Sequence, residues 1–160
     1  MKVCLVVSLY APEFEGGTEI AVRAQARALV ELGHDVRVVA GMNALVEDGQ
    51  PERSETRVDG TTVVQLPRTR EESHVLKLDR PRLLELCARE VAGADVVHVH
   101  HWWTLSSGLV QRLGETAPVV ASLHDYFACC PRFFRSPIVE GVVCPEVAGM
   151  HEPCAECMAA

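Results

Sequence analysis

The stretch Leu9–Glu19, read Leu-Tyr-Ala-Pro-Glu-Phe-Glu-Gly-Gly-Thr-Glu, lies between a short apolar run at 3–7 and a long helical pattern. It is therefore expected to join a first buried strand to a first helix. Gly16 and Gly17 have no Cβ and let the backbone approach a ligand, and Thr18 is expected to cap the helix. The unpaired N–H groups of a helix start suit a phosphate or a hydroxyl-rich ligand, and an ordinary glycine turn is the equal alternative.

A dinucleotide site is not expected in this loop. Such sites need Gly-x-Gly-x-x-Gly in a tight turn and an acidic residue about 20 residues further on, after the second strand. Here the two glycines are adjacent, Pro12 stiffens a longer loop, and residues 40–43 contain no acid. We therefore expect neither NAD nor FAD, and a dinucleotide oxidoreductase is excluded.

Composition limits the class of protein. The 160 residues, 48% of them hydrophobic, suit one domain with a real core, and a net charge of -7 without a basic stripe argues against nucleic-acid binding. The first apolar run stops at Ser8 without a cleavage site, and no stretch reaches the roughly 18 apolar residues of a transmembrane helix. We expect a cytoplasmic protein, at most peripheral to a membrane.

The first half of the chain predicts a βαβ unit and a hairpin. Apolar residues at helical spacing precede Gly33, which is expected to end the helix, and 35–40 reads as a second, parallel strand. The predicted buried face of the helix consists of Ile20, Val22, Ala26, Leu29 and Val30. Residues 41–56 are polar and predict a surface loop, whereas Asp59-Gly60 predicts a hairpin between 56–58 and 61–66. The charged residues 68–72 predict a solvent-exposed segment that connects the hairpin to the next helix.

The second half predicts two further strand and helix pairs. A helix is expected from about Pro81 to Gly93, with Cys87 in the core; its apolar face is Leu83, Leu84, Leu86, Cys87 and Val91. A strand at 95–100, a short helix at 104–113 and a strand at 118–123 follow. The fold class is thus α/β, a Rossmann-like parallel sheet with helices on both faces, with an irregular Cys-rich subregion at 126–160.

Histidines cluster where the predicted strands end. His98 and His100 share one strand face, and His124 with Asp125 follows the last strand, so the glycine loop, His100 and His124 are expected at one crevice. His124 could move a proton near neutral pH, or its ring could simply be satisfied by local backbone. His98 is expected to be buried, with His100 or His101 facing the crevice, because His-x-His alone is not a specific zinc signal.

Two tryptophans, Trp102 and Trp103, follow these histidines. They could stack on a sugar or a base, but an interface with another domain is the favoured reading.

Five of the seven cysteines lie between Cys129 and Cys157. Clustering of this kind in a reducing compartment favours a metal over disulfides. A closed site of Cys130, Cys144, Cys154 and Cys157 would suit structural zinc first and an iron–sulfur cluster second. Free thiols are the remaining alternative.

Several pieces together resemble the amino-terminal domain of GT-B glycosyltransferases of the GT4 family. They are Pro12 with 16–19, the helix end at 28–36, the strand at 95–100, and 123–126 followed by 130–132. The resemblance covers residues 1 to about 135 and is carried by the order and spacing of these pieces. A subgroup of the family also resembles the chain in its later cysteines.

The resemblance implies a retaining, nucleotide-sugar-dependent transferase whose two Rossmann-like domains face each other across a cleft. This domain would mainly bind the acceptor, which would be a glycan, a lipid or a small molecule. His124 is the implied catalytic residue, contacting sugar hydroxyls, and the reaction would be a front-face attack assisted by the leaving phosphate. The implied donor- or acceptor-binding residues are Gly16, Gly17, Thr18, His100, Asp125 and Arg132.

The chain departs from the family pattern in one respect. Most donor-binding residues of the family lie in a carboxyl-terminal domain, and this sequence reaches Ala160 before one begins. We therefore expect either a fragment or a natural truncation, with no turnover by residues 1–160 alone. The alternative hypothesis is a non-catalytic, metal-stapled Rossmann-like module that binds a nucleotide or a carbohydrate.

Overall fold

The computed structural model describes residues 1–47, 52–74, 79–128 and 130. The chain forms two compact units, Met1–Ser122 and Leu123–Ala160. The helices and strands of the described residues all belong to the first unit. In chain order they are β1 (Lys2–Val7), α1 (Gly17–Glu31), β2 (Asp35–Val46), β3 (Ser54–Val58), β4 (Thr61–Thr69), α2 (Pro81–Val91), β5 (Val96–Val99), α3 (Leu109–Gly114) and β6 (Val119–Ala121).

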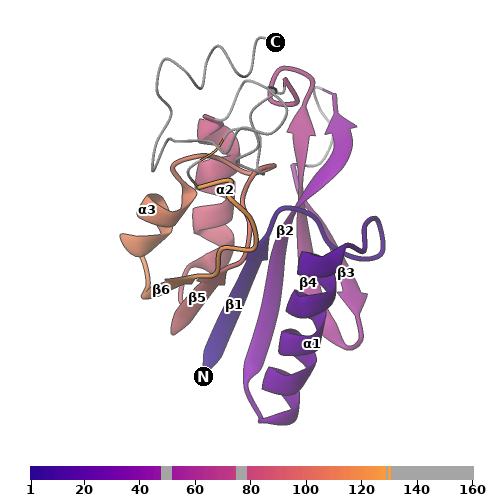
Figure 1. Cartoon of the computed structure of the whole chain (residues 1–160), viewed down its shortest axis with the longest axis vertical. Coiled ribbons are helices and arrows are strands. Elements are labelled where there is room, and N and C mark those ends of the chain that lie inside the picture. The colour runs from indigo at the N-terminus through magenta and orange to yellow at the C-terminus, as the bar shows by residue number, and fades with distance from the viewer. Residues whose placement is uncertain (48–51, 75–78, 129, 131–160) are drawn as a thin grey trace, which may run out of the picture. The chain divides into compact units, whose positions relative to one another are not determined.

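The strands form one sheet in the order β3-β4-β2-β1-β5-β6 (Figure 1). Only the β3–β4 pair is antiparallel; the other four pairs are parallel. The chain places β2 on one side of β1 and β5 on the other, so the direction of winding reverses at β1. The predicted α/β class, a Rossmann-like and mostly parallel sheet with helices, is confirmed.

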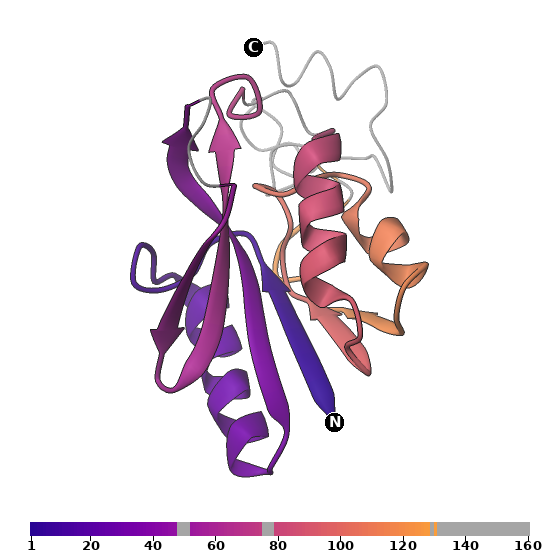
Figure 2. The same cartoon turned by 180° about the vertical axis from the view of Figure 1, so that it is seen from behind.

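Helices cover both faces of this sheet. In Figure 1 α1 lies in front of the strands, and in the reverse view of Figure 2 the strands lie in front of α1, with α2 on the viewer's side. The face under α1 buries alternate residues of β1 together with Val22 and Ala26 of the helix. Cys87 of α2 is fully buried, as predicted. Side-chain alternation along β1 thus supplies two apolar layers.

The buried stripe of α1 is narrower than the sequence predicted. Val22 and Ala26 are buried, but Ile20 and Val30 are 60% and 45% exposed, so their predicted burial is wrong. At 3.6 residues per turn Ile20 lies nearly opposite Val22 on the helix, so the two cannot share one buried face. Gly33 has a φ of 82°, which confirms its role in ending the helix.

The predicted surface loop at 41–56 is wrong over much of its length. β2 continues to Val46, and β3 begins at Ser54. The extension pairs with β4, because Leu45 lies opposite Arg68 after a register irregularity that begins at Gly41. The polar residues that suggested a loop begin at Glu47, after the end of β2, whereas residues 42–46 are mostly apolar and pair with β4.

The hairpin prediction is confirmed. Asp59 and Gly60 have φ of 49° and 82° and join β3 to β4, as expected for an Asp-Gly turn. The two later elements are shorter than predicted, since α3 begins at Leu109 and β6 covers only 119–121. None of the helices in the described part of the chain combines the length and the apolar character that crossing a membrane requires.

Candidate functional site

The loop before α1 is held by the chain's own contacts. The backbone N–H of Phe14 donates to the Tyr10 carbonyl at 3.2 Å, and Gly16 is the N-cap of the helix. Glu19, only 7% exposed, accepts a hydrogen bond from the Gly16 N–H at 3.0 Å. The predicted cap by Thr18 is therefore wrong, because the Glu19 carboxylate satisfies this donor and adds a favourable charge at the helix start.

The two glycines of the loop have different surroundings. A Cβ on Gly16 would lie 2.7 Å from Glu19 Oε2 and 2.9 Å from the Phe14 ring, so a larger residue there would have to displace one of these side chains. A Cβ on Gly17 would meet nothing within 4 Å. Gly17 thus leaves the first turn of α1 open, and its predicted approach to a ligand stays a prediction.

Arg23 ties this loop to the β3–β4 hairpin. Its guanidinium donates to Glu15 at 2.6 Å and to both oxygens of Asp59 at 2.6 and 3.1 Å. The hydrogen bond from Arg23 lowers the pKa of the Asp59 carboxyl. Three segments distant in sequence are therefore joined at one side chain.

The carboxyl ends of β1 and β5 meet at the point where the sheet reverses its winding. The Ser8 hydroxyl lies 2.7 Å from His101 Nδ1, and the hydroxyl of Thr104 donates to the Ser8 carbonyl. A Cβ on Gly41, at the neighbouring part of β2, would overlap the Thr104 hydroxyl and lie 2.6 Å from the Ser8 carbonyl. This junction is where open α/β sheets bind their ligands. Sequence reasoning missed Ser8, whose signal is a polar residue that ends an apolar strand.

His98 and His100 lie side by side beneath α1. Their ring centroids are 4.1 Å apart, which confirms that they share a face of the strand. His98 is half-buried, and His100 is 5% exposed with its Nε2 2.7 Å from Gln25 Oε1. His101 is also half-buried, and its ring contacts Ser8 at the end of β1.

The prediction of a solvated connection at 68–72, at the same edge of the sheet, is wrong for its two ends, whereas Arg70 and Glu71 between them are exposed as expected. Arg68 and Glu72 are each 6% exposed, and Arg80 is fully buried. Arg80 donates to the carbonyls of Glu72 and Trp103, both at 2.7 Å. Arg82 donates to both oxygens of Glu72 at 3.1 and 2.6 Å. The pairing with Arg82 explains how the Glu72 carboxylate becomes buried.

Two pKa shifts follow from this arrangement. Burial alone would raise the pKa of Glu72, but the hydrogen bonds from Arg82 and Thr69 outweigh it and lower the pKa. Burial and then the charge of Arg68 lower the pKa of Arg80.

Both tryptophans belong to this edge. Trp102 is 9% exposed, and Trp103 is half-buried with the Arg68 guanidinium 5.6 Å from its ring centroid. The expectation that they cover a domain interface stays a prediction.

The second unit carries the catalytic candidate. His124 is exposed and Asp125 is half-buried. Asp125 Oδ1 accepts a hydrogen bond from the Phe127 N–H at 2.8 Å, and the Cys130 N–H donates to the Tyr126 carbonyl at 2.7 Å. Asp125 therefore shapes a local turn. The expectation that His124 and Asp125 share a crevice with the glycine loop stays a prediction.

The structure does not test the predicted metal ligands or the predicted ligand-binding arginine near the carboxyl terminus. Arg132, Cys144, Cys154 and Cys157 lie outside the described residues, and Cys130 within them is a partly exposed free thiol. Among the described residues no group of three His, Cys, Asp or Glu side chains could hold a metal ion. Nothing there favours a metal-stapled module.

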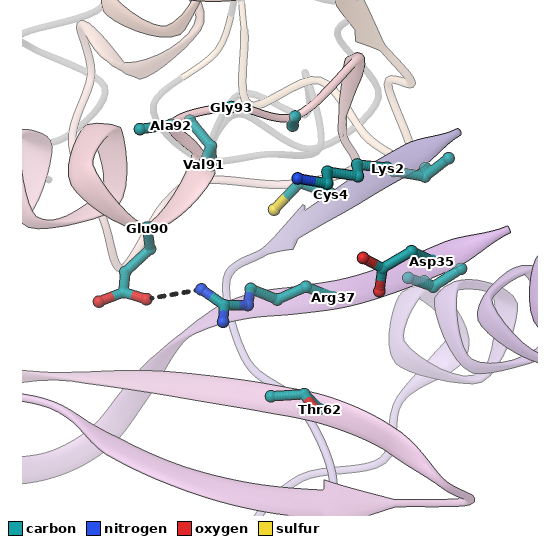
Figure 3. A pocket seen from close by; sticks show the side chains of 12 residues that line it. Lys2, Cys4, Asp35, Arg37, Thr62, Glu90, Val91, Ala92 and Gly93 are labelled. Carbon is teal, nitrogen blue, oxygen red and sulfur yellow. Dashed lines mark hydrogen bonds and ion pairs between the residues drawn. The ribbon is translucent and has the colours of Figure 1, made fainter.

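A pocket of about 260 Å³ lies at the opposite edge of the sheet. It is lined by the first residues of β1 and β2, including Lys2 and Asp35, and by the end of α2 (Figure 3). Glu90 pairs with Arg37 at 3.2 Å across it, and the Cys4 thiol, whose pKa burial raises to about 12, forms part of the wall. The pocket is thus remote from the strand ends that carry the candidate residues.

Sequence comparison establishes the family. Residues 15–140 match Glycosyltransferase Family 4, which is most of the chain. The chain belongs to Glycosyltransferase Family 4. No curated protein sequence matches it.

Solved structures agree with this fold. The catalytic domain of starch synthase IV from Arabidopsis thaliana, bound to ADP and acarbose, is 17% identical with a TM-score of 0.52, over 78% of this chain and 34% of that one. A UDP-forming α,α-trehalose-phosphate synthase from Burkholderia xenovorans, in complex with glucose-6-phosphate, is 13% identical with a TM-score of 0.59, over 78% and 34%. A trehalose-6-phosphate structure from E. coli with UDP-2-fluoro glucose is 11% identical with a TM-score of 0.55, over 77% and 33%. The chain spans about a third of each.

Proposed function

We propose that the chain is the acceptor-side domain of a retaining, nucleotide-sugar-dependent glycosyltransferase acting on a glycan, a glycolipid or a small molecule. Membership of Glycosyltransferase Family 4 carries the proposal. The packed junction of Ser8, His101 and Thr104 at the reversal point of the sheet supports it, because ligands of open α/β sheets bind there. A cytoplasmic location, with peripheral membrane contact when the acceptor is a lipid, belongs to the same proposal.

The donor in this proposal is a nucleoside diphosphate sugar. Solved structures with the same fold contain ADP or UDP-2-fluoro glucose, and we extend that donor class to this chain. The open first turn at Gly17 would let the transferred sugar approach the backbone. Because Glu19 already places a carboxylate at the Gly16 N–H, a sugar hydroxyl suits this point better than a phosphate.

Transfer with retention follows a front-face course in this proposal. The bond between the anomeric carbon and the phosphate oxygen breaks while the acceptor oxygen bonds to the same face of that carbon. The acceptor proton passes to the leaving phosphate. His124 would hydrogen-bond sugar hydroxyls next to the reacting carbon, so its contribution is positioning and charge stabilisation.

A second domain is part of the proposal. The chain spans about a third of the solved proteins that it matches, and the family resemblance assigns most donor contacts to a carboxyl-terminal domain. We therefore expect residues 1–160 alone to show no glycosyl transfer.

The test uses the complete reading frame that contains this chain. Nucleoside diphosphate release is measured with UDP-, ADP- and GDP-sugars and an acceptor panel, and the anomeric configuration of the product is read by NMR. We expect release with retained configuration. Absence of transfer with every donor would contradict the proposal, and an inverted product would contradict the retaining course.

Substitution of His124 tests its assigned role. Because His124 is exposed, His124→Ala should leave the unfolding free energy nearly unchanged while turnover falls about 100-fold, as for loss of one transition-state donor. His34→Ala, in the turn between α1 and β2, is the matched control and should keep full turnover. Unchanged turnover in His124→Ala would remove His124 from the site.

A further inference from the structure

One side-chain amide contacts both stacked histidines. Gln25, half-buried on α1, places its Nε2 3.0 Å from His98 Nδ1 and its Oε1 2.7 Å from His100 Nε2. The other nitrogen of His98 lies 2.9 Å from the Ser122 hydroxyl. A continuous chain of hydrogen bonds therefore runs from α1 through β5 to the residue just after β6.

The orientation of the Gln25 amide, with Nε2 toward His98 and Oε1 toward His100, sets the direction of these bonds. A carbonyl oxygen only accepts, so His100 Nε2 must carry the proton that faces Gln25 Oε1. An amide nitrogen only donates, so His98 Nδ1 must be unprotonated. A neutral His98 then carries its proton on Nε2 and donates to the Ser122 oxygen.

We infer that Gln25 is a positioning residue that sets the tautomers of His98 and His100 and joins α1 to the end of β6. Apolar packing alone would also hold two rings with centroids 4.1 Å apart, but it would leave the protons unassigned. A tautomer is set by the hydrogen bond that the other ring nitrogen makes. Gln25 thus gives two adjacent imidazoles the same Nε2–H form.

Histidine-ring NMR on residues 1–160 tests the assignment directly. Long-range nitrogen–proton correlation, recorded above neutral pH, distinguishes Nδ1–H from Nε2–H rings. We expect both His98 and His100 as Nε2–H forms in the wild type. Either ring found as Nδ1–H would overturn the inference, and neither result depends on glycosyl transfer.

The isosteric variant Gln25→Glu sharpens the test. Both of its carboxylate oxygens only accept, so His98 Nδ1 should become protonated while the Ser122 hydroxyl turns to donate to His98 Nε2. His100 should keep Nε2–H. Gln111→Glu, on the exposed face of α3, is the control and should leave both rings as in the wild type. A His98 ring that keeps the wild-type form in Gln25→Glu would contradict the assigned role.

Discussion

The two edges of the sheet differ in what they offer a ligand. The amino edge contains a pocket of about 260 Å³ between the first residues of the strands and the end of α2, with an ion pair of Arg37 and Glu90 beside it. At the carboxyl edge, strand ends are packed so tightly that Gly41 cannot carry a Cβ without displacing Thr104 or Ser8.

The two edges differ in the chemical groups that they can offer to a polar ligand. The amino-edge pocket presents the buried Cys4 thiol, and its Glu90 carboxylate already pairs with Arg37 and Arg53. The carboxyl edge collects oriented hydroxyl, imidazole and backbone groups from β1 and β5, which recognition of a polar ligand requires. Changes at the two edges should therefore have separable effects on stability and on function.

The largest effect is expected for Gly41→Ala. The new Cβ would overlap the Thr104 hydroxyl, so the strand ends must move apart at a cost of roughly 3 kcal/mol in unfolding free energy. Urea denaturation measures the loss. The control is Gly114→Ala at the end of α3, where a Cβ meets nothing within 4 Å and stability should stay within about 1 kcal/mol of the wild type. Equal stability of both variants would show that the carboxyl edge is not tightly packed.

An intermediate effect is expected for Glu72→Gln. Losing the charge that Arg82 and the Thr69 N–H contact should lower the unfolding free energy by about 2 kcal/mol at neutral pH. Because the folded pKa of Glu72 lies below its ordinary value of 4.5, this contribution is present above pH 4.5 and is lost as pH falls through the folded pKa. In urea titrations at decreasing pH, the unfolding free energies of the wild type and of Glu72→Gln should therefore converge.

The matched control for that titration is Glu85→Gln. The Glu85 pKa is lowered by the hydrogen bond from Arg112, but the pair is exposed and screened by solvent. The unfolding free energies of the wild type and of Glu72→Gln could also differ by the same amount at every pH. That result would show that the charge of Glu72 is not what stabilises the arginine cluster.

The smallest effect is expected at the amino edge. Glu90→Gln weakens pairs with Arg37 and Arg53 at 3.2 and 2.9 Å, but both arginine side chains are more than 40% exposed. The loss should be about 0.5–1 kcal/mol and should shrink at high salt. Glycosyl transfer by the complete enzyme should be unaffected, and a clear fall in transfer would assign function to the amino edge.

Local signals predicted most of the fold. Apolar runs gave β1 and β5, helical spacing gave α1 and α2, and the Asp59-Gly60 turn gave the hairpin. Each of these depends on residues close together in the chain, where periodicity and turn chemistry decide the structure.

Long-range pairing decided what the sequence could not predict. The end of β2, Met42 to Val46, is largely apolar but directly precedes a polar run, and its pairing with β4 extends the strand beyond Ala40, where the sequence pattern placed its end. Arg68 and Glu72 look like solvated charges until Arg80 and Arg82, which follow Glu72 by eight and ten residues, are placed beside them. The ligand contacts assigned to the glycine loop and to His100 stay predictions. The contact of Gln25 with the histidines was not predicted, because it depends on two rings some 75 residues further along the chain.

The Arg23 bridge between Glu15 and Asp59 also bears on binding kinetics. A loop that must first close around its ligand associates slowly and loses conformational entropy on binding. Here the folded chain already restrains the segment before α1 from both sides, through Arg23 and through Glu19. We expect association at this loop to be limited by diffusion and orientation, with an on-rate that does not depend on a preceding rearrangement.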